Sequence, residues 1–490
     1  MAYYLLHAGQ PSAVRLLRRV RRLHEYASNS LVTSSDTVIR WGQSKENDPS
    51  LGYILNPGAA LARVRSRTAV GRLLQRFGIR FLPLDKSEDT SEVHIVRQYR
   101  FPIFNLQALA CFRADHGPAW ISRRIQRVQE SFREVDFDSE NVNTRAMWLA
   151  LRSLHSLGLD HGLVSIGMTQ KGVLYVLDVT VTPLLTGRLL ELYTQAVEVL
   201  MDSGDENGAT GLSQLQLGTD IELMLCNAQG KMVLASRYAT RTGRVGCDDR
   251  SIQFDGKRLP LLEFRPDSSA TPAGLLENLR ETMLEGLELI PWPKIEWRAG
   301  SMPFRPFCTG GHIHISGIPF SSRLVRALDN YLGLLTMMVE DPLTARLRRP
   351  RYGFLGDIRF KQHGGFEYRT PASFVVNKEV TEAALTLAYV VARYHHDLPV
   401  FDLYEPGLQT AFYEGQSAIL FPIAQRNMFF LRALPNYGQS REALEPLFDM
   451  IQQNQHWDEQ MDVRKVWGLP VVKKRQTTRR SSRVEVRTLS

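Results

Sequence analysis

Four short segments in the second half of the chain each carry two charged or imidazole side chains one residue apart. The pairs are Asp220 and Glu222 in "GTDIELML", Glu263 and Arg265 in "LLEFRP", His312 and His314 in "GGHIHISG", and Glu367 and Arg369 in "GGFEYRTP". Successive side chains of a strand point to opposite faces, so each pair shares one face and its apolar neighbours share the other. The pattern therefore predicts a sheet with one face against helices and one face lined by carboxylates, imidazoles and guanidinium groups.

Such a polar face suits divalent cations bound to a phosphorylated substrate. Carboxylate oxygens with one imidazole are typical ligands of Mg²⁺ or Mn²⁺, whereas tetrahedral zinc more often has cysteine or three histidines. Arginines hold phosphate oxygens through a planar fork of donors. A plainer interpretation stays open, because any single pair at this spacing is often only the solvated side of an antiparallel sheet.

The segment 346–359, "RLRRPRYGFLGDIR", adds positive charge. It carries Arg348, Arg349, Arg351 and Arg359 around two glycines. A loop of this kind can close positive charge over a phosphoryl group during transfer, and we expect Arg351 and Arg359 to act there. A basic surface loop is the alternative.

The net charge of +9 is concentrated at the end of the chain. The last twenty residues, "VVKKRQTTRRSSRVEVRTLS", hold seven Lys/Arg and one Glu, so they account for +6 and the other 470 residues for +3. We predict that 471–490 is a disordered, solubilising tail. The body is not basic, which argues against nucleic acid as its partner.

The sequence shows neither a recognisable targeting signal nor a Cys-x-x-Cys pair. No apolar run approaches the roughly 18–20 residues needed to cross a bilayer. The Arg-rich segment "AVRLLRRVRRLHEY" lacks the features of a signal peptide, and we expect an amphipathic helix there, with a transit peptide as the alternative. Four scattered cysteines without a CxxC pair argue against disulfides or structural zinc and favour the cytoplasm.

The alternation of elements predicts an α+β protein with two domains. In the first 200 residues we expect strands at "AYYLLHA", "DTVIRWG" and "EVHIVRQY", helices at 11–27 and 144–158, and a hairpin formed by "LVSIGM" and "VLYVLDVTV". The small, polar stretch 203–213 marks a boundary between domains at 1–202 and 214–465. Long helices are expected at 321–340 and 378–396.

The four-strand pattern resembles the glutamine synthetase and gamma-glutamylcysteine synthetase superfamily. It is most similar to the superfamily's amidoligase branch, the phage-type carboxylate–amine ligases. The resemblance spans roughly 215–430 and keeps the order of the motifs: an acidic-x-Glu strand, a later Glu, a Gly-rich His-x-His strand and a Glu-x-Arg strand. It implies a curved antiparallel sheet backed by helices that binds ATP with Mg²⁺ or Mn²⁺.

The resemblance also implies which residues hold the metal ions. Asp220, His312 and Glu367 would bind one ion, and Glu222 with Glu263 would bind the other. Asp220 stands where glutamine synthetase has Glu, so the chelating arm is shorter here.

The remaining polar residues receive roles in nucleotide and substrate binding. His314 and Arg265 would contact nucleotide phosphate, and Arg369 would contact both ATP and the phosphoryl group in transfer. Asp248 and Asp249, in "GCDDRS", would hold the incoming amine, with Asp249 as the candidate in catalysis. An Asp-Asp turn before a strand is also commonly structural.

The N-terminal region resembles a second ligase fold, ATP-grasp. The stretch "LGLDHGLVSIGMTQKGVLYVLDVTVTP" is similar to the end of that fold, where the last strand usually offers Glu-x-Asn to magnesium. Asp178 and Thr180 stand at those positions here. The segment between "RFGIRFLP" and "EVHIVRQY" is too short for the usual lysine-bearing strand and Gly-rich loop. A degenerate ATP-grasp-like domain is therefore expected over 1–202.

These features favour an ATP-dependent carboxylate–amine ligase that forms an amide or peptide bond through an acyl phosphate. Its partners would be small-molecule or peptide carboxylates and amines, and a homo-oligomer is left open. No Walker lysine motif or kinase signature is present, so ATP would bind to the sheet and its metals. Two alternatives remain: a non-catalytic nucleotide- or peptide-binding protein that keeps the ligase fold, and a guanidine-type phosphotransferase.

Overall fold

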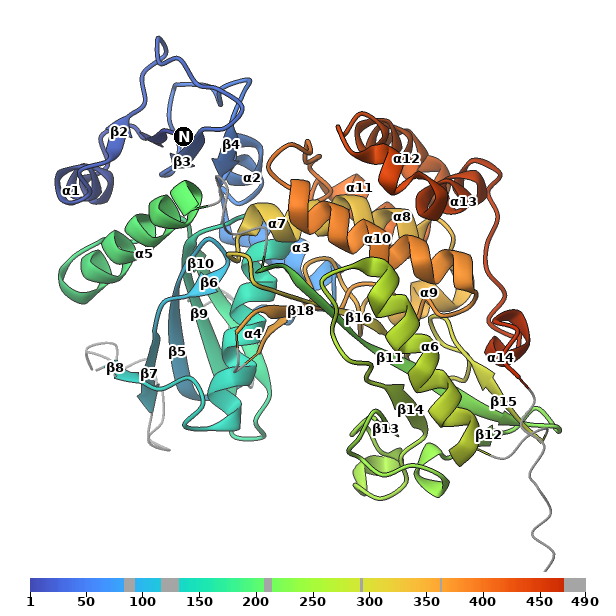
Figure 1. The fold of residues 1–490 in the computed structure, drawn as a ribbon. Helices are drawn as coiled ribbons and strands as arrows, with labels where there is room; N and C mark the ends of the chain where they lie inside the picture. Colours follow the sequence, from blue (N-terminus) through green and yellow to red (C-terminus); the bar gives the residue numbers. More distant parts are fainter. Residues whose placement is uncertain (83–92, 116–131, 207–213, 291–293, 362–363, 471–490) are drawn as a thin grey trace, which may run out of the picture.

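The computed structural model describes residues 1–82, 93–115, 132–206, 214–290, 294–361 and 364–470. These residues form three sheets with helices between and around them (Figure 1). The predicted tail at 471–490 lies outside the described residues.

The first sheet is parallel, with strand order β2-β1-β3-β4. It consists of β1 (Tyr3–Leu6), β2 (Leu23–Glu25), β3 (Thr37–Arg40) and β4 (Tyr53–Leu55). Helices α1 (Pro11–Arg19) and α5 (Gly187–Glu206) contact each other beside it. The single helix predicted over 11–27 is wrong: α1 ends at Arg19, Val20 is extended, and buried Leu23 begins a strand that pairs with β1. Pairing with the sheet outweighs the helical pattern there.

The second sheet has strand order β10-β9-β5-β7-β8, with β6 paired to β5. Its strands are β5 (Ile95–Phe104), β6 (Gln107–Ala108), β7 (Cys111–Asp115), β8 (Arg133–Val135), β9 (Gly162–Thr169) and β10 (Leu174–Thr180). Helices α2 (Gly58–Arg63) and α3 (Arg67–Arg76) precede it, and α4 (Asn141–Ser156) contacts β9 and β10. The predicted hairpin is confirmed, since β9 and β10 pair antiparallel.

The third sheet is antiparallel and contains all four strands with the polar pairs. Its order is β13-β14-β11-β16-β18-β17, with β12 and β15 paired to β11. The strands are β11 (Gln216–Asn227), β12 (Met232–Val233), β13 (Val245–Cys247), β14 (Leu261–Phe264), β15 (Ile295–Arg298), β16 (Gly311–Ser316), β17 (Ile358–Phe360) and β18 (Phe366–Tyr368).

Helices pack against the third sheet and extend beyond it (Figure 1). They are α6 (Pro272–Leu289), α7 (Ser322–Leu328), the π-helix η4 (Asp329–Gly333), α8 (Leu334–Met337), α9 (Pro342–Arg348), α10 (Lys378–Tyr394), α11 (Pro406–Glu414), α12 (Ser417–Arg432), α13 (Arg441–Gln452) and α14 (Val463–Val466). Short 3₁₀ turns lie at η2 (Ala235–Arg237), η3 (Ile252–Phe254) and η5 (Tyr437–Gln439). Side chains of Thr271 and Asn377 cap the first turns of α6 and α10.

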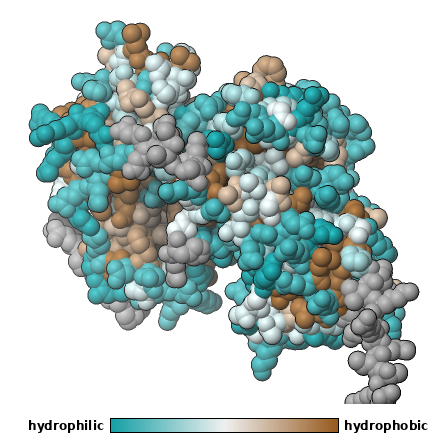
Figure 2. All heavy atoms as spheres, in the orientation of Figure 1, coloured by the Kyte–Doolittle hydropathy of each residue, from teal (hydrophilic) through white to brown (hydrophobic). Residues whose placement is uncertain are grey.

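One hydrophobic core runs through the second and third sheets, and a smaller one lies under the first. The larger core includes Tyr99 and Ile166 from the second sheet and Phe264 and Ile313 from the third. The smaller core includes Trp41. No helix among the described residues is long and apolar enough to cross a membrane, and Figure 2 shows hydrophilic side chains over most of one face. The fold is thus mixed α and β, with antiparallel sheets.

Candidate metal centre

The strand register places the polar pairs directly opposite one another on one face of the third sheet. Glu222 on β11 faces Glu263 on β14, Asp220 faces His312 on β16, and His314 faces Glu367 on β18. Between them, Ile221, Phe264, Ile313 and Tyr368 are buried in the core on the other face. The prediction of one polar and one apolar face is confirmed.

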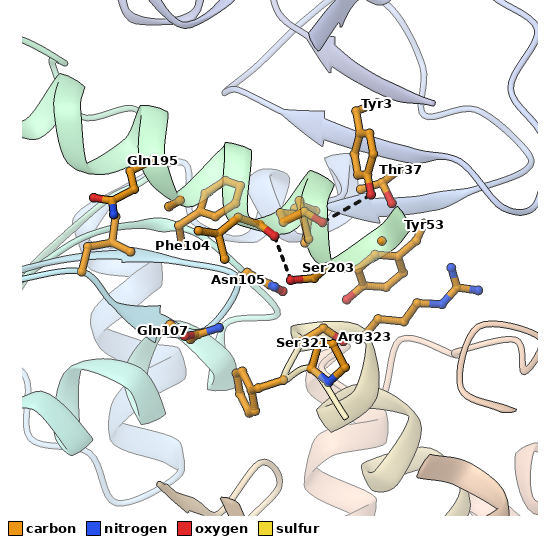
Figure 3. Close-up of a pocket in the computed structure, with 18 of the residues that line it drawn as sticks. Tyr3, Thr37, Tyr53, Phe104, Asn105, Gln107, Gln195, Ser203, Ser321 and Arg323 are labelled. Atoms are coloured by element: carbon orange, nitrogen blue, oxygen red, sulfur yellow. Dashed lines mark hydrogen bonds between the residues drawn. The ribbon is translucent and has the colours of Figure 1, made fainter. Parts of the chain in front are cut away.

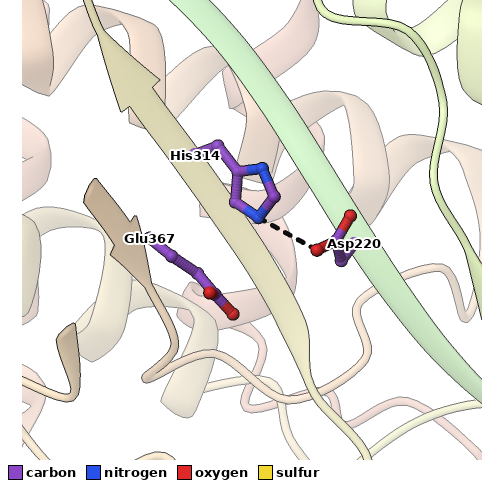
Figure 4. Close-up of side chains that lie close together, drawn as sticks. All are labelled: Asp220, His314 and Glu367. Atoms are coloured by element: carbon purple, nitrogen blue, oxygen red, sulfur yellow. Dashed lines mark ion pairs between the residues drawn. The ribbon is translucent and has the colours of Figure 1, made fainter. Parts of the chain in front are cut away.

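Three overlapping groups of these side chains bring possible ligand atoms within 4.8 Å of one another. The groups are Asp220, His314 and Glu367; Asp220, Glu263 and His312; and Glu222, Asp248 and Glu263. Figure 4 shows the first group, in which His314 Nε2 lies 3.1 Å from Asp220 Oδ2. A row of carboxylates and imidazoles therefore crosses β14, β11, β16 and β18.

These groups overlap the predicted metal sets but divide the residues differently. The predicted set of Asp220, His312 and Glu367 is linked through His312, whose Nδ1 lies 2.9 Å from Glu367 Oε1. The same imidazole reaches the second set, since its Nε2 lies 3.6 Å from Glu222 Oε1. His314, expected at nucleotide phosphate, lies beside Asp220.

Burial and neighbouring charges shift the pKa values of these carboxyl groups in opposite directions. Burial, with help from nearby Asp220 and Glu222, raises the pKa of Glu263 to about 8 although Arg265 opposes the shift. Burial also acts to raise the pKa of Glu367, but the hydrogen bond from His312 and the charge of Arg369 bring it below its usual value. Carboxyl groups with perturbed pKa values gathered in one place are typical of functional sites.

The two arginines of the Glu-x-Arg pairs lie beside their glutamates. Arg265 pairs with Glu263 and also donates to the Cys247 carbonyl oxygen at 3.1 Å. Arg369 Nε lies 3.2 Å from Glu367 Oε1. Both guanidinium groups therefore reach the polar face of the sheet.

The prediction that Arg348 and Arg349 belong to a closing loop is wrong. Both side chains are fully buried. Arg348 donates to the carbonyl oxygens of Thr309 and Pro371 at 2.7 Å, and Arg349 donates to Glu340 Oε2 at 2.7 Å. Their donors are occupied within the fold, because α9 continues as far as Arg348 and turns both side chains inward.

Arg351 and Arg359 are exposed, in contrast to their buried neighbours. Arg351 follows α9 in a turn, where its amide donates to the Arg348 carbonyl oxygen at 2.9 Å. Arg359 lies on β17 directly opposite Glu367, on the polar face of the sheet. The register thus brings Arg359 to the row of metal-type ligands.

Of the two adjacent aspartates, the structure brings Asp248 into the centre. Asp248 joins the group with Glu222 and Glu263, and its Oδ1 lies 2.6 Å from Arg250 Nε. Asp249 is exposed and outside these groups.

Three residues of the centre were missed by sequence reasoning: Arg250, Tyr352 and Lys361. Arg250 Nη2 lies 2.5 Å from Glu222 Oε2, and Lys361 Nζ lies 2.9 Å from Glu367 Oε2. The Tyr352 hydroxyl donates to Glu222 Oε1 at 2.8 Å and also bonds His312 Nε2. Arg250 directly follows the Asp248–Asp249 pair, and this position could have identified it from the sequence. Nothing in the sequence singles out Tyr352 except its place in the Arg-rich segment 346–359.

At the N-terminal site, Asp178 and Thr180 bond each other. Thr180 Oγ1 donates to Asp178 Oδ2 at 2.6 Å, and Arg67 Nε lies 3.2 Å from Asp178 Oδ1. A cavity of about 260 Å³ beside them is also lined by Arg65. Asp178 thus already forms an ion pair with an arginine of the protein, Arg67.

Comparison with known proteins gives one family match. The model of the family "Phage phiEco32-like COOH.NH2 ligase-type 2" matches residues 217–469, just over half of the chain. That span contains every strand of the third sheet except the first residue of β11. No curated protein matches the chain.

Three solved structures show a remote likeness to this chain. A bifunctional glutathione synthetase from Pasteurella multocida is 10% identical with a TM-score of 0.33, over 54% of this chain and 49% of that one. The macrocyclase MdnC from Microcystis aeruginosa, solved with its precursor peptide MdnA, is 9% identical with a TM-score of 0.28, over 41% and 100%. A glutamine synthase homolog is 14% identical with a TM-score of 0.28, over 53% and 69%. This chain therefore spans about half the length of the glutathione synthetase.

Proposed function

The chain belongs to the phage phiEco32-like COOH.NH2 ligase-type 2 family, and from this we propose that it is an ATP-dependent carboxylate–amine ligase working through an acyl phosphate. The observation that carries the proposal is the row of carboxylates, imidazoles and guanidinium groups across one face of the third sheet. Such a row offers ligands for cations and donors for phosphate on one rigid surface.

The donor set fits Mg²⁺ or Mn²⁺. Asp220, Glu222, Glu263, His312 and Glu367 would hold the ions, which would neutralise the phosphate oxygens of bound ATP. Glu263 fits this role because it is buried beside Asp220 and Glu222, and burial together with their charges raises its pKa. His314, Asp248 and Lys361 lie close enough to orient these ligands.

The arginines would act on the phosphoryl group. In the first step an oxygen of the substrate carboxylate attacks the terminal phosphorus of ATP, and ADP leaves. Arg369 and Arg265 would hold phosphate oxygens, and exposed Arg351 and Arg359 would add positive charge from the adjoining turn and strand. Arg369 Nη2 donates to the Tyr352 hydroxyl at 3.1 Å, which orients its fork.

The second step would join the amine to the activated carboxyl group. The amine nitrogen attacks the acyl carbon, inorganic phosphate leaves, and the nitrogen gives up a proton. Asp249 is exposed at the edge of the centre, next to Asp248, where a carboxylate can hold an incoming ammonium group and accept that proton. Small molecules or peptides would supply the carboxylate and the amine.

The N-terminal region would serve this reaction without catalysing a ligation of its own. We propose that 1–202 is a degenerate ATP-grasp-like domain and 214–465 a glutamine-synthetase-like domain. Asp178 already pairs with Arg67, and Thr180 offers no carboxamide or carboxylate to a metal.

Arg369→Lys tests the ligase, because lysine keeps the charge but loses the planar fork. A screen of amines for phosphate release from ATP first identifies a substrate. With that substrate, the turnover of the variant should fall on the order of 10²–10³-fold, while its affinity for ATP changes far less. Arg346→Lys, an exposed change on α9, should behave as the wild type. Unchanged turnover in the Arg369 variant would remove that residue from the mechanism, and the absence of amine-dependent phosphate release would refute the ligase.

A further inference from the structure

A second candidate site is a cavity of about 320 Å³ where the two halves of the chain meet. It lies between the first sheet, helix α5, the turn after β5, and residues 319–323 and 395–396. Figure 3 shows Gln195 at one end of the labelled side chains and Arg323 at the other. Its volume suits a small organic molecule. Among the described residues, none that forms the metal centre lines it.

The walls of the cavity are mostly apolar. Leu55, Phe104, Leu192 and Leu200 line it from the N-terminal half, and Phe320 lines it from the C-terminal half. The neutral amides of three residues supplement them: Asn105, Gln107 and Gln195. A ligand that fills this space therefore needs an apolar body.

Among the described residues that line the cavity, Arg323 is the only lysine or arginine, and none of them carries a carboxylate side chain. Its Nε donates to the His395 carbonyl oxygen at 3.1 Å, and its guanidinium lies 5.2 Å from the centre of the Tyr53 ring. Among the described residues no carboxylate lies within ion-pair distance of it. Burial lowers its pKa, although the more distant charge of Asp397 opposes the shift. A half-buried guanidinium without a carboxylate in ion-pair contact attracts an anion.

The two histidines beside Arg323 do not compete for that anion as cations. Burial, together with the charge of Arg323, lowers the pKa of His396 to about 4. Burial lowers the pKa of His395 as well. Both rings are therefore neutral at neutral pH, and among the described side chains that line the cavity Arg323 carries the positive charge.

The turn that borders the cavity is held in an unusual backbone conformation. Asn105 and Leu106 have φ angles of 51° and 56°, in the left-handed region that a residue such as leucine rarely adopts. The Asn105 side chain accepts a hydrogen bond from the Ser322 amide at 2.7 Å, which ties the turn to α7. Residues held in this way often border ligand sites.

We propose that this cavity binds a small carboxylic acid with an apolar body. The carboxylate approaches Arg323, and the body packs between α5 and Phe320. Because the ligand contacts both halves of the chain, its binding stabilises their junction. The proposal does not depend on the ligase reaction.

The test uses three probes that share one apolar body: 3-phenylpropionate, 3-phenylpropanol and 3-phenylpropylamine. Calorimetric titration of the full chain without nucleotide or metal gives their dissociation constants. We expect the carboxylate to bind on the order of tenfold more tightly than the alcohol, and the amine more weakly than the alcohol, because only the carboxylate pairs with the guanidinium.

Two substitutions on one helix locate the binding site. Ala196→Trp places a large side chain in the cavity wall and should abolish binding of 3-phenylpropionate. Glu198→Trp places the same side chain on the exposed side of α5 and should leave the dissociation constant unchanged. Arg323→Gln should weaken the carboxylate on the order of tenfold and leave the alcohol unaffected.

The outcomes separate the proposal from its rivals. Equal affinity for the three probes, tightest binding of the amine, or no binding of the carboxylate would overturn it. Unchanged carboxylate affinity in Ala196→Trp would place the binding elsewhere and overturn it too. If Arg323→Gln does not fold, the probe series and the α5 pair still decide.

Discussion

At the scale of single residues, Tyr352 occupies the centre of the polar face. Its hydroxyl bonds both Glu222 and His312, one from each predicted metal set. The guanidinium groups of Arg250 and Arg369 lie 4.8 Å and 4.9 Å from the centre of its ring. The hydroxyl thus engages two atoms that a bound metal ion would also need.

Tyr352→Phe should therefore strengthen metal binding. The variant leaves His312 and Glu222 without the hydroxyl, so a metal ion no longer replaces those hydrogen bonds when it binds. A hydrogen bond to a charged group is worth about 1.5–3 kcal/mol, so Mn²⁺ affinity should rise on the order of tenfold. Titration followed by electron paramagnetic resonance measures it, with Tyr175→Phe on β10 as the control. An unchanged or weaker affinity would show that the hydroxyl does not compete with the metal.

His312→Ala and Glu367→Ala should each weaken binding of Mn²⁺ with ATP by on the order of 10–100-fold. Both side chains lie on the polar face, so their truncation removes ligand atoms and leaves the apolar packing intact. Calorimetric titration gives the affinity, and circular dichroism checks the fold. Glu288→Ala, an exposed change on α6, is the matched control. Wild-type affinity in both variants would contradict a metal site on this face.

The sequence predicted the paired residues but not Tyr352. A spacing of two residues in a strand decides on which face a side chain lies, so Asp220 and His312 could be assigned without the fold. Tyr352 lies in an irregular turn, where no period applies. The inward turn of Arg348 and Arg349 depends on the carbonyl oxygens and Glu340 that receive their hydrogen bonds, which only the tertiary structure brings together.

At the scale of secondary-structure elements, Asp329 of the π-helix η4 holds several segments together. Its carboxylate accepts hydrogen bonds from Tyr368 on β18 and from the Gly356 amide before β17, both at 2.8 Å. Its other oxygen lies 2.9 Å from His155 Nε2 on α4 and also bonds Tyr404. Because Tyr368 lies between Glu367 and Arg369, this network positions the last strands of the metal centre.

Gly356→Ala should disrupt that network. Gly356 has φ +67°, and an added Cβ would overlap the buried His155 ring. Gly230 has φ +71° but open space around it, so Gly230→Ala costs only the backbone strain. We expect about 1 kcal/mol of destabilisation for Gly230→Ala and about 3 kcal/mol or more for Gly356→Ala. Urea unfolding measures both, and equal losses would show that the His155 contact does not matter.

Helices and strands could be predicted from the sequence where the periodicity of a segment agrees with its packing in the fold. The strands with polar pairs and the helix over 378–396 are confirmed by β11, β14, β16, β18 and α10. The helix predicted over 321–340 contains a π-turn at η4, which sequence periodicity does not reveal. The helix predicted over 11–27 is wrong because Leu23–Glu25, in its second half, pair with β1.

At the scale of the whole molecule, the two halves share a core and buried polar contacts. Arg326 Nε on α7 lies 2.9 Å from Asp160 Oδ1, and both side chains are buried. The larger core contains residues from both the second and the third sheets. The boundary at 203–213 stays a prediction, because a change of composition marks a linker in sequence but does not tell how closely the flanking parts pack.

This shared core predicts that the halves unfold together. Calorimetry should show a single transition, and a fragment of residues 1–206 should fail to unfold cooperatively, since it lacks its partners in the larger core. Two separate transitions, or a cooperative fragment, would show that the halves are independent.

Buried His161 should make the stability of the whole molecule depend on pH. Its ring stacks on Trp41 at 5.1 Å between centroids, and burial lowers its pKa to about 4, below the model-peptide value of 6.5. The unfolded chain therefore binds the extra proton between about pH 4 and 6.5. The contribution of neutral His161 is complete above pH 6.5 and is lost as the pH falls to about 4.

Substitution of His161 measures how much this residue contributes to the pH dependence of stability. Each pKa unit corresponds to about 1.4 kcal/mol, so the free energy of unfolding should fall about 3 kcal/mol between pH 6.5 and 4 through His161 alone. His161→Phe keeps the stacking but cannot bind a proton, so its stability curve should be flatter across this window. His24→Phe, at an exposed site, should keep the wild-type slope. Urea unfolding at a series of pH values measures the slopes, and equal slopes in all three proteins would mean that His161 is already protonated or exposed in the folded chain.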